Sequence, residues 1–236
     1  MLGFALIAGA IFFSGNSGVA PVAPAKTADG VVPTNTTPTV VRPVDETDYV
    51  RGNPNAPIMV IEYSDYDCPF CKSFHDTMNR VMEEHGVTGK VGWVYRQFPL
   101  AQLHPNAPRI SEAAYCVGEL GDDAAFWEFS DLIFSDRETN EPTNMSRLPE
   151  FAEAAGVSRA AFSSCLESGK YTNAVAVSIQ EGVAAGAQGT PYSIVVVGDQ
   201  QAVINGAQPY AVVKQIVDNL VDQIEGTTAA PAEAAS

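Results

Sequence analysis

The sequence is poor in basic residues, with 13 Lys and Arg against 28 Asp and Glu, and its net charge is −15. Nucleic-acid binding requires clustered basic side chains, and electrostatic docking on anionic lipid requires a polybasic segment. The composition therefore argues against both kinds of partner. Charged residues make up only 17 % and apolar residues 46 %, so the chain can form a sizeable core beneath an acidic, solvated surface.

Histidine and cysteine are also scarce. The three histidines lack the spacing of a zinc-binding helix, and the four cysteines include a single C-x-x-C, so the pattern does not support structural zinc. The sequence contains neither a Walker A phosphate loop nor a Gly-x-Ser-x-Gly elbow. We therefore expect no metal and no organic cofactor.

The apolar run at residues 2–13 is too short for an ordinary membrane-spanning helix. As a helix it would rise about 18 Å, against about 30 Å for the hydrocarbon core of a bilayer. Residues 1–13 are predicted to be a signal peptide or an N-terminal membrane anchor, although no basic residue precedes Lys26. Residues 14–46 have the composition of a flexible linker, and residues 226–236 that of a disordered tail. One domain is expected between them, at residues 47–225.

Hydrophobic periodicity predicts an α/β domain. We expect strands at 58–63 and 91–98, a helix at 73–84, a hairpin formed by 192–197 and 201–204, and a closing helix at 210–224. Helical patterns fill the interval between the second strand and the hairpin, at 107–120, 124–134, 148–155, 159–167 and 171–185. This order indicates an α/β core that carries an inserted helical subdomain at about residues 100–186.

The single C-x-x-C motif, Cys68-Pro69-Phe70-Cys71, follows the first strand and opens the first helix. Unpaired N–H groups and the helix dipole favour a thiolate there, so Cys68 is the candidate nucleophile. Cys71, one turn further on, is the candidate resolving thiol. Pro69 suits the first helical turn, where its missing N–H costs nothing. The alternative is a structural disulfide within the motif.

The motif and its surroundings resemble the thioredoxin superfamily. The similarity includes the C-P-F-C segment between strand and helix, and Gly189-Thr190-Pro191 before a later strand. The inserted helices, the Phe98-Pro99-Leu100 segment and residues 104–107 narrow it to DsbA-like proteins, over roughly residues 47–225. The resemblance implies a thioredoxin-like fold with an inserted α-helical subdomain, and an extracytoplasmic disulfide oxidoreductase.

The resemblance also implies roles for three residues outside the motif. Glu62 matches the buried acid beneath the active site, which can exchange a proton with Cys71. Pro191 matches the family's cis-proline opposite the cysteine pair. Thr190 would present backbone groups to an extended substrate peptide. The alternatives are an ordinary strand carboxylate for Glu62 and a trans turn proline for Pro191.

The sequence departs from the strongly oxidising DsbA enzymes at Phe70, where they have histidine. Phenylalanine cannot donate a hydrogen bond or a positive charge to the Cys68 thiolate. Asp65 and Asp67 would also disfavour a second negative charge nearby. We therefore predict a weaker oxidant, with a Cys68 pKa less depressed than in C-P-H-C enzymes. Phe70 and Pro69 would contact the client protein. The alternative is that Phe70 only packs against the rest of the domain.

Cys116 and Cys165 lie in two predicted helices of the insert. We interpret them as a structural disulfide, with two free buried thiols as the alternative. Such a bond would close a loop of about 50 residues, which costs the unfolded chain about 4 kcal/mol of entropy in the loop model.

Together these features predict an extracytoplasmic oxidoreductase that is secreted, periplasmic or tethered to a membrane by its N-terminus. Its partners would be unfolded or cysteine-containing client proteins and a separate protein that recycles the pair. A reductase or isomerase of the same fold is the nearest alternative. A non-catalytic, chaperone-like client-binding module is the alternative from another class.

Overall fold

The computed structural model describes residues 41–228. The predicted signal or anchor at residues 1–13, residues 14–40 of the predicted linker and residues 229–236 of the predicted tail lie outside this range.

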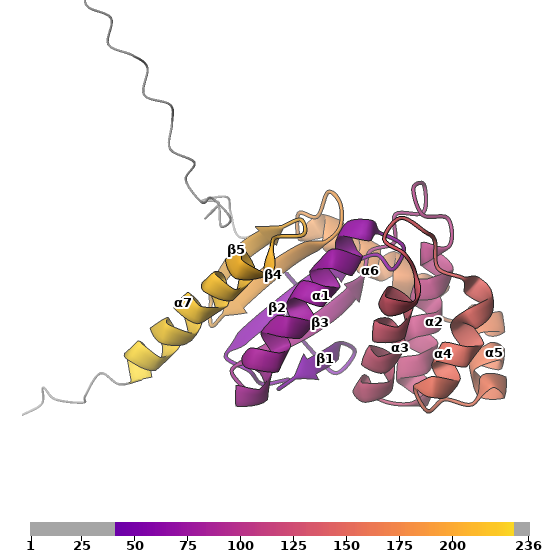
Figure 1. The fold of residues 1–236 in the computed structure, drawn as a ribbon, viewed down its shortest axis with the longest axis horizontal. Coiled ribbons are helices and arrows are strands. Elements are labelled where there is room, and N and C mark those ends of the chain that lie inside the picture. Colours follow the sequence, from indigo (N-terminus) through magenta and orange to yellow (C-terminus); the bar gives the residue numbers. More distant parts are fainter. Residues whose placement is uncertain (1–40, 229–236) are drawn as a thin grey trace, which may run out of the picture.

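A single five-stranded mixed sheet forms the centre of the domain (Figure 1), in the order β1-β3-β2-β4-β5. The parallel pair is β2 and β3, with Glu62 opposite Tyr95, whereas the other neighbours run antiparallel. The strands are β1 (Tyr49–Gly52), β2 (Ile58–Ser64), β3 (Val91–Gln97), β4 (Tyr192–Val197) and β5 (Gln200–Asn205).

Helices cover both faces of the sheet, because alternate residues of the buried strands point to opposite sides. Ile58 and Val60 share a core with α1 (Pro69–Glu84) and α7 (Tyr210–Thr228). Met59 and Ile61 belong to a second core, against which α6 (Thr172–Ala184) packs. Figure 1 shows α1 and α7 in front of the sheet and α6 behind it. The face toward α1 is the one that carries Glu62.

The helical insert lies between β3 and β4 in the chain, and its helices other than α6 lie beside the sheet (Figure 1). A disulfide joins its helices α2 and α5 through Cys116 and Cys165, whose Cα atoms are 5.9 Å apart. The predicted α/β fold with an inserted helical subdomain is confirmed. The insert comprises α2 (Ala107–Leu120), α3 (Asp123–Asp136), the 3₁₀ turn η2 (Met145–Arg147), α4 (Leu148–Ala154), α5 (Arg159–Ser168) and α6.

The predicted domain limits need correction at both ends. Val41 is buried, and Arg42 forms ion pairs with Asp48 and Glu181 at 2.8 and 3.0 Å, so the chain contacts the domain before the predicted boundary at residue 47. At the other end α7 continues to Thr228, beyond the predicted start of the tail. The short strand β1 was not predicted, because four residues are too few to display an alternating pattern.

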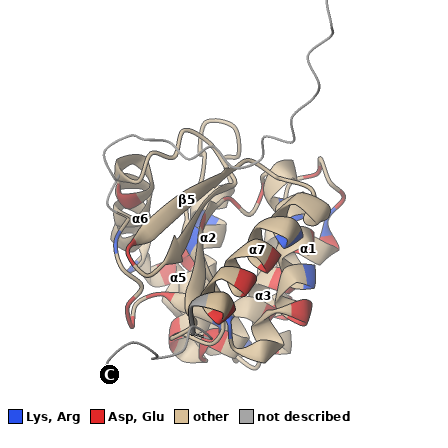
Figure 2. Ribbon diagram, turned by 90° about the vertical axis from the view of Figure 1, so that its left-hand side faces the viewer, with Lys and Arg blue, Asp and Glu red and all other residues tan. Residues whose placement is uncertain are grey.

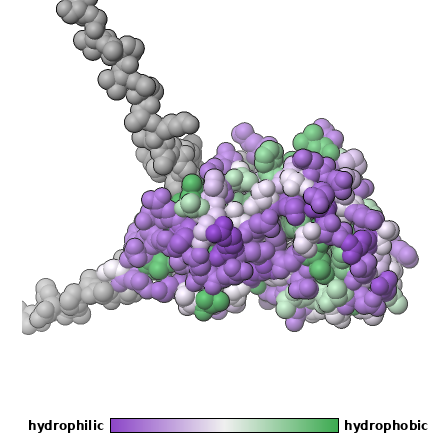
Figure 3. Space-filling view, viewed as in Figure 1, coloured by the Kyte–Doolittle hydropathy of each residue, from purple (hydrophilic) through white to green (hydrophobic). Residues whose placement is uncertain are grey.

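The surface is largely polar. Figure 2 shows acidic positions interleaved with basic ones along α1 and α7, and Figure 3 shows hydrophobic side chains in small separate patches on the viewed face. Among residues 41–228, no helix is both long and apolar enough to cross a membrane.

Candidate active site

Cys68 and Cys71 lie at the N-terminus of α1, directly after the turn that follows β2. Cys68 occupies the N-cap position with an extended backbone (φ −71°, ψ 127°), and its carbonyl accepts from the Lys72 amide at 3.2 Å. Cys71 is fully buried in the first turn, and both cysteines are free thiols in this structure. Pro69 stands at the first position of the helix, as predicted from its missing N–H.

The two thiols differ sharply in acidity. The hydrogen bond from the Cys71 thiol is the largest cause that lowers the pKa of Cys68 to about 6, and the amides of Cys71 and Phe70 add to it. Burial raises the pKa of Cys71 well above its usual value, and the charge on Cys68 raises it further. At neutral pH Cys68 is therefore largely a thiolate while Cys71 keeps its proton.

A second segment, distant in sequence, faces Cys68. The Cys68 Sγ lies 3.5 Å from the carbonyl oxygen of Thr190, and the peptide bond between Thr190 and Pro191 is cis. Sheet register brings the two segments together, because β4 starts right after Pro191 and pairs with β2, with Tyr192 opposite Tyr63. The ends of β2 and β4 thus place the cysteine motif and the proline side by side.

Glu62 lies in β2, on the sheet face that α1 covers. Only 1 % of its surface is exposed, and its Oε2 accepts a hydrogen bond from Trp93 Nε1 at 2.9 Å. Its Oε1 has no hydrogen-bond partner among the described residues. Burial raises the pKa of Glu62 to about 7, and its charge raises the pKa of Cys71. A carboxyl group with this pKa can hold or release a proton near neutral pH.

Asp65 and Asp67 organise the turn before the cysteines. The Asp65 amide donates to Cys71 Sγ at 3.5 Å, and its buried carboxylate accepts from the Leu100 amide at 2.7 Å and lies 2.9 Å from His104 Nδ1. The Asp67 carboxylate accepts from the Thr143 amide at 2.8 Å. Both carboxylates thus bind the turn to loops of the insert, a role that sequence reasoning missed.

Arg137 is a second residue that sequence reasoning missed. It ends α3, and its Nη2 donates to the Cys68 carbonyl at 2.9 Å. No motif surrounds this arginine in the sequence, and only the folding of the insert places it beside Cys68, 69 residues earlier in the chain.

Phe70 and Pro69 lie at the edge of the site. The Phe70 side chain does not pack in the core, because 64 % of its surface is exposed. Pro69 and Asp67 border a hollow of about 400 Å³ toward the insert, and its lining also includes Leu103 and Pro142. Phe70 therefore offers an exposed apolar side chain two residues from Cys68, which is itself only 4 % exposed.

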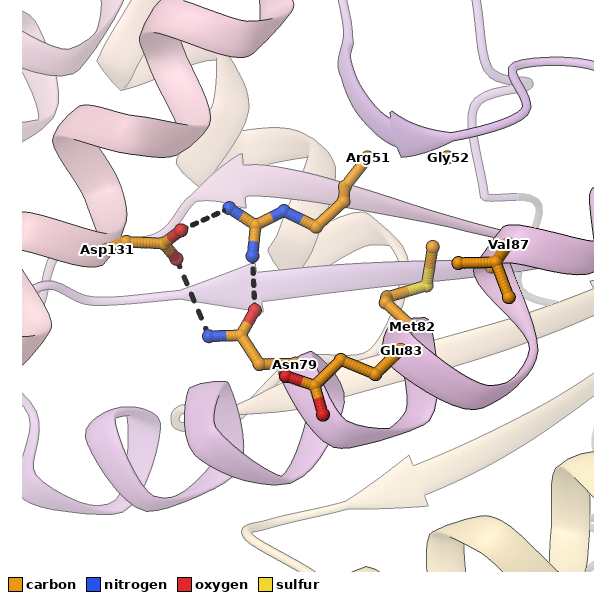
Figure 4. Close-up of a pocket in the computed structure, with 8 residues that line it drawn as sticks. Arg51, Gly52, Asn79, Met82, Glu83, Val87 and Asp131 are labelled. Atoms are coloured by element: carbon orange, nitrogen blue, oxygen red, sulfur yellow. Dashed lines mark hydrogen bonds and ion pairs between the residues drawn. The ribbon is translucent and has the colours of Figure 1, made fainter.

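A larger hollow of about 530 Å³ lies among β1, α1 and α3 (Figure 4). Three of its polar groups pair with one another: Arg51 forms an ion pair with Asp131 at 2.7 Å, and Asn79 contacts both. The Arg51 guanidinium also lies 4.5 Å from the centre of the Trp127 ring. This cluster joins the sheet to the insert, and Glu83, which also lines the hollow, takes no part in it. Within residues 41–228, no group of three His, Cys, Asp or Glu side chains is placed to hold a metal ion.

Comparisons with known proteins agree with this geometry. The family model described as Thioredoxin matches residues 44–219. The crystal structure of oxidised BdbD from Bacillus subtilis superposes with a TM-score of 0.64 at 21 % identity, over 75 % of this chain and 94 % of that one. The thiol-disulfide exchange protein alpha-DsbA2 from Wolbachia pipientis has a TM-score of 0.62 at 21 % identity, over 75 % and 88 %.

A curated relative matches about half of this chain within a longer protein. A Na(+)/H(+) antiporter NhaA 1 of Mycolicibacterium gilvum is 37 % identical over 121 residues, which are 50 % of this chain but only 18 % of the antiporter. The chain thus spans about a fifth of the length of that relative. Because the family model covers most of the described domain, the chain belongs to the thioredoxin family, and its fold is that of the DsbA-like disulfide oxidoreductases.

Proposed function

We propose that this protein is a thiol–disulfide oxidoreductase of extracytoplasmic clients, in which Cys68 exchanges with the client and Cys71 resolves the mixed disulfide. The observation that carries the proposal is the difference in acidity between the two thiols at the start of α1. Cys68 has a pKa of about 6, whereas the pKa of buried Cys71 is raised well above its usual value. A structural C-x-x-C would not need this division between a nucleophile and a protected thiol.

When the protein oxidises a client, a client thiolate attacks the Cys68 sulfur of the Cys68–Cys71 disulfide. The intramolecular S–S bond breaks, and Cys71 leaves as a thiolate that takes up a proton. A second client thiolate then attacks the client sulfur of the mixed disulfide, and Cys68 leaves as the stable thiolate. The client loses two electrons and the protein gains them. Reduction of a client disulfide is the same sequence in reverse.

Glu62 is the proposed source of the proton for Cys71. Its pKa of about 7 lets it exist in either form at the pH of the reaction, and the charges of the two groups interact. The backbone of Thr190 beside cis-Pro191 is the proposed docking edge for an extended client peptide, supported by its 3.5 Å contact with the Cys68 sulfur. Exposed Phe70, with Pro69, would add apolar contact to an unfolded client.

Three observations support an extracytoplasmic compartment for this protein. The disulfide between Cys116 and Cys165 supports an oxidising environment, and the predicted signal or anchor at residues 1–13 supports export. One protein of similar fold, with a TM-score of 0.57 at 16 % identity, is a periplasmic thioredoxin-like protein from Salmonella enterica. A protein that restores the redox state of the pair after each turnover would be its second partner.

Two assays on one preparation test the proposal. The disulfide form is mixed with a reduced, unfolded client, and the dithiol form is mixed with insulin. We expect both reactions to proceed in the wild type and to be lost in Cys68→Ser, and a faster client oxidation would favour an oxidase over a reductase or isomerase. Client binding without either reaction would instead identify a chaperone-like module.

A further inference from the structure

A buried cation lies directly behind the reactive cysteine. Arg137 is 5 % exposed, and its Nη2 donates to the Cys68 carbonyl at 2.9 Å. Its Nη1 donates to the carbonyls of Thr139 and Glu141, both at 3.1 Å, in the loop that follows α3. Three backbone carbonyls therefore fix the guanidinium against the active-site turn.

The hydrogen bonds of Arg137 leave its charge unneutralised. Within residues 41–228 all its acceptors are carbonyls, and its Nε has no partner. A buried charge of this kind is costly unless an opposite charge lies close to it. Burial lowers the pKa of Arg137, whereas Asp67 and Cys68 raise it, in that order of strength. An arginine side chain is a strong enough base that the guanidinium stays protonated at neutral pH.

We propose that Arg137 is a positioning residue through which the helical insert tunes the active site: its guanidinium holds the Cys68 turn and stabilises negative charge on the Cys68 sulfur. This rests on the proposed function, because the charge matters only if Cys68 reacts as a thiolate. In the disulfide form the sulfur is neutral, and in the dithiol form it carries a negative charge. A fixed cation therefore stabilises the reduced state and makes the pair a better oxidant.

The proposal also explains how the site functions with phenylalanine in the motif. Phe70 donates no charge to Cys68. The ammonium group of Lys72, the next cation along α1, is bound to the carbonyl of Phe134. Arg137 thus supplies from the insert the positive charge that the motif itself lacks. The other titratable or charged groups around this turn are Glu62, Asp65, Asp67, Cys71, His104 and Glu141.

Two substitutions separate the charge of Arg137 from its packing. Arg137→Met keeps the aliphatic stem and removes the cation, and Arg137→Lys keeps a cation. The thiolate absorbance at 240 nm gives the Cys68 pKa, and redox buffers of glutathione give the equilibrium of the pair. For Arg137→Met we expect a pKa about one unit higher and an equilibrium at pH 8 shifted about tenfold toward the disulfide form. Arg137→Lys should shift the equilibrium less than about threefold.

A folded Arg137→Met protein with the wild-type Cys68 pKa and glutathione equilibrium would overturn the proposal. If Arg137→Met does not fold, Arg137→Gln decides, because the glutamine amide can still donate to the Cys68 carbonyl while the positive charge is gone. The Cys68 pKa should again rise by about one unit, and an unchanged pKa would contradict the role of Arg137. Failure of the proposed function is separate, because the wild type itself would then not exchange with glutathione.

Discussion

The sulfur of Cys68 lies 3.5 Å from the carbonyl oxygen of Thr190, although 122 residues separate them. The contact joins the two ends of the thioredoxin core across the inserted helices, because β2 delivers the cysteines and β4 begins right after Pro191. A client peptide bonded to Cys68 would have the backbone of Thr190 beside it.

Alkylation should distinguish the two cysteines by pH. Because its pKa is about 6, Cys68 in the dithiol protein should react with iodoacetamide at a rate that rises with a midpoint near pH 6. Buried Cys71 should stay unreactive over the same range. Mass spectrometry of the alkylated peptides measures both rates. A midpoint near 9 for Cys68, the usual value for a thiol, would contradict the proposed nucleophile.

The variant Cys71→Ser should trap the client. Once Cys68 has attacked a client disulfide, no second thiol remains to release it, so a mixed disulfide should accumulate. Non-reducing gels with a disulfide-containing client show the adduct, and Cys68→Ser is the matched control that should form none. Adducts of equal yield in both variants would mean that either cysteine can react, contrary to the burial of Cys71.

The carboxyl group of Glu62 should make stability depend on pH. Its pKa is about 7 in the folded protein against 4.5 as a free side chain, so the folded state binds the proton more tightly. Its contribution to stability is therefore complete below pH 4.5 and falls as the pH rises through 7, by about 3 kcal/mol in all.

Glu62→Gln removes this dependence while its side-chain carbonyl can still accept from Trp93. In urea unfolding, the stability of Glu62→Gln relative to the wild type should rise between pH 4.5 and pH 8. The same variant should lose the inflection near pH 7 in the rate of client release. Parallel stability curves for the two proteins would mean that Glu62 is not a buried acid of raised pKa.

Phe70→His should make the pair more oxidising. The exposed side chain can be exchanged without disturbing the core, and a histidine adds a donor and a partial positive charge near the Cys68 thiolate. We expect the glutathione equilibrium to shift about tenfold toward the dithiol form. Phe70→Leu is the control, with the apolar surface kept and no charge added, and its equilibrium should stay near that of the wild type. Equal shifts in both variants would assign the effect to the lost ring.

The insert disulfide should contribute to stability and not to redox chemistry. Replacing Cys116 and Cys165 by alanine frees a loop of 49 residues in the unfolded chain. The free energy of unfolding should fall by about 4 kcal/mol in the loop-entropy model, while the Cys68–Cys71 equilibrium stays the same. Urea unfolding and glutathione titration measure the two quantities. A changed equilibrium would identify this pair as a second redox centre.

Much of the architecture can be predicted from the sequence, because it depends on local hydrophobic patterns. The buried strand at 58–63 and the helical periodicity between the second strand and the hairpin predict the α/β core and its insert, which the structure confirms. Cys68 and Cys71 stand out because a strand ends and a helix begins at their motif. The strand β1 is not predicted from local patterns, because its four residues form a strand by pairing with β3.

The residues that hold the cysteine turn in place cannot be predicted from the sequence in the same way. Arg137 and Thr143 contact the cysteine turn through the tertiary packing of loops, and their neighbours in sequence carry no motif. Sequence reasoning assigned Asp65 and Asp67 only a repulsive effect on the thiolate. Their hydrogen bonds to Leu100 and Thr143 show that they also tie the turn to the insert. The effect of a charged residue on the cysteines can be assigned only when the fold shows how close the two groups are.

The reduction potential of the Cys68–Cys71 pair, measured against glutathione, tests the central claim most directly. The Cys68 thiolate stabilises the dithiol form, so the potential should lie above the about −270 mV of thioredoxin. The motif lacks histidine, so the potential should lie below the about −120 mV of DsbA. A pair that does not exchange with glutathione at all would be structural, and the assignment of a thiol–disulfide oxidoreductase would be wrong.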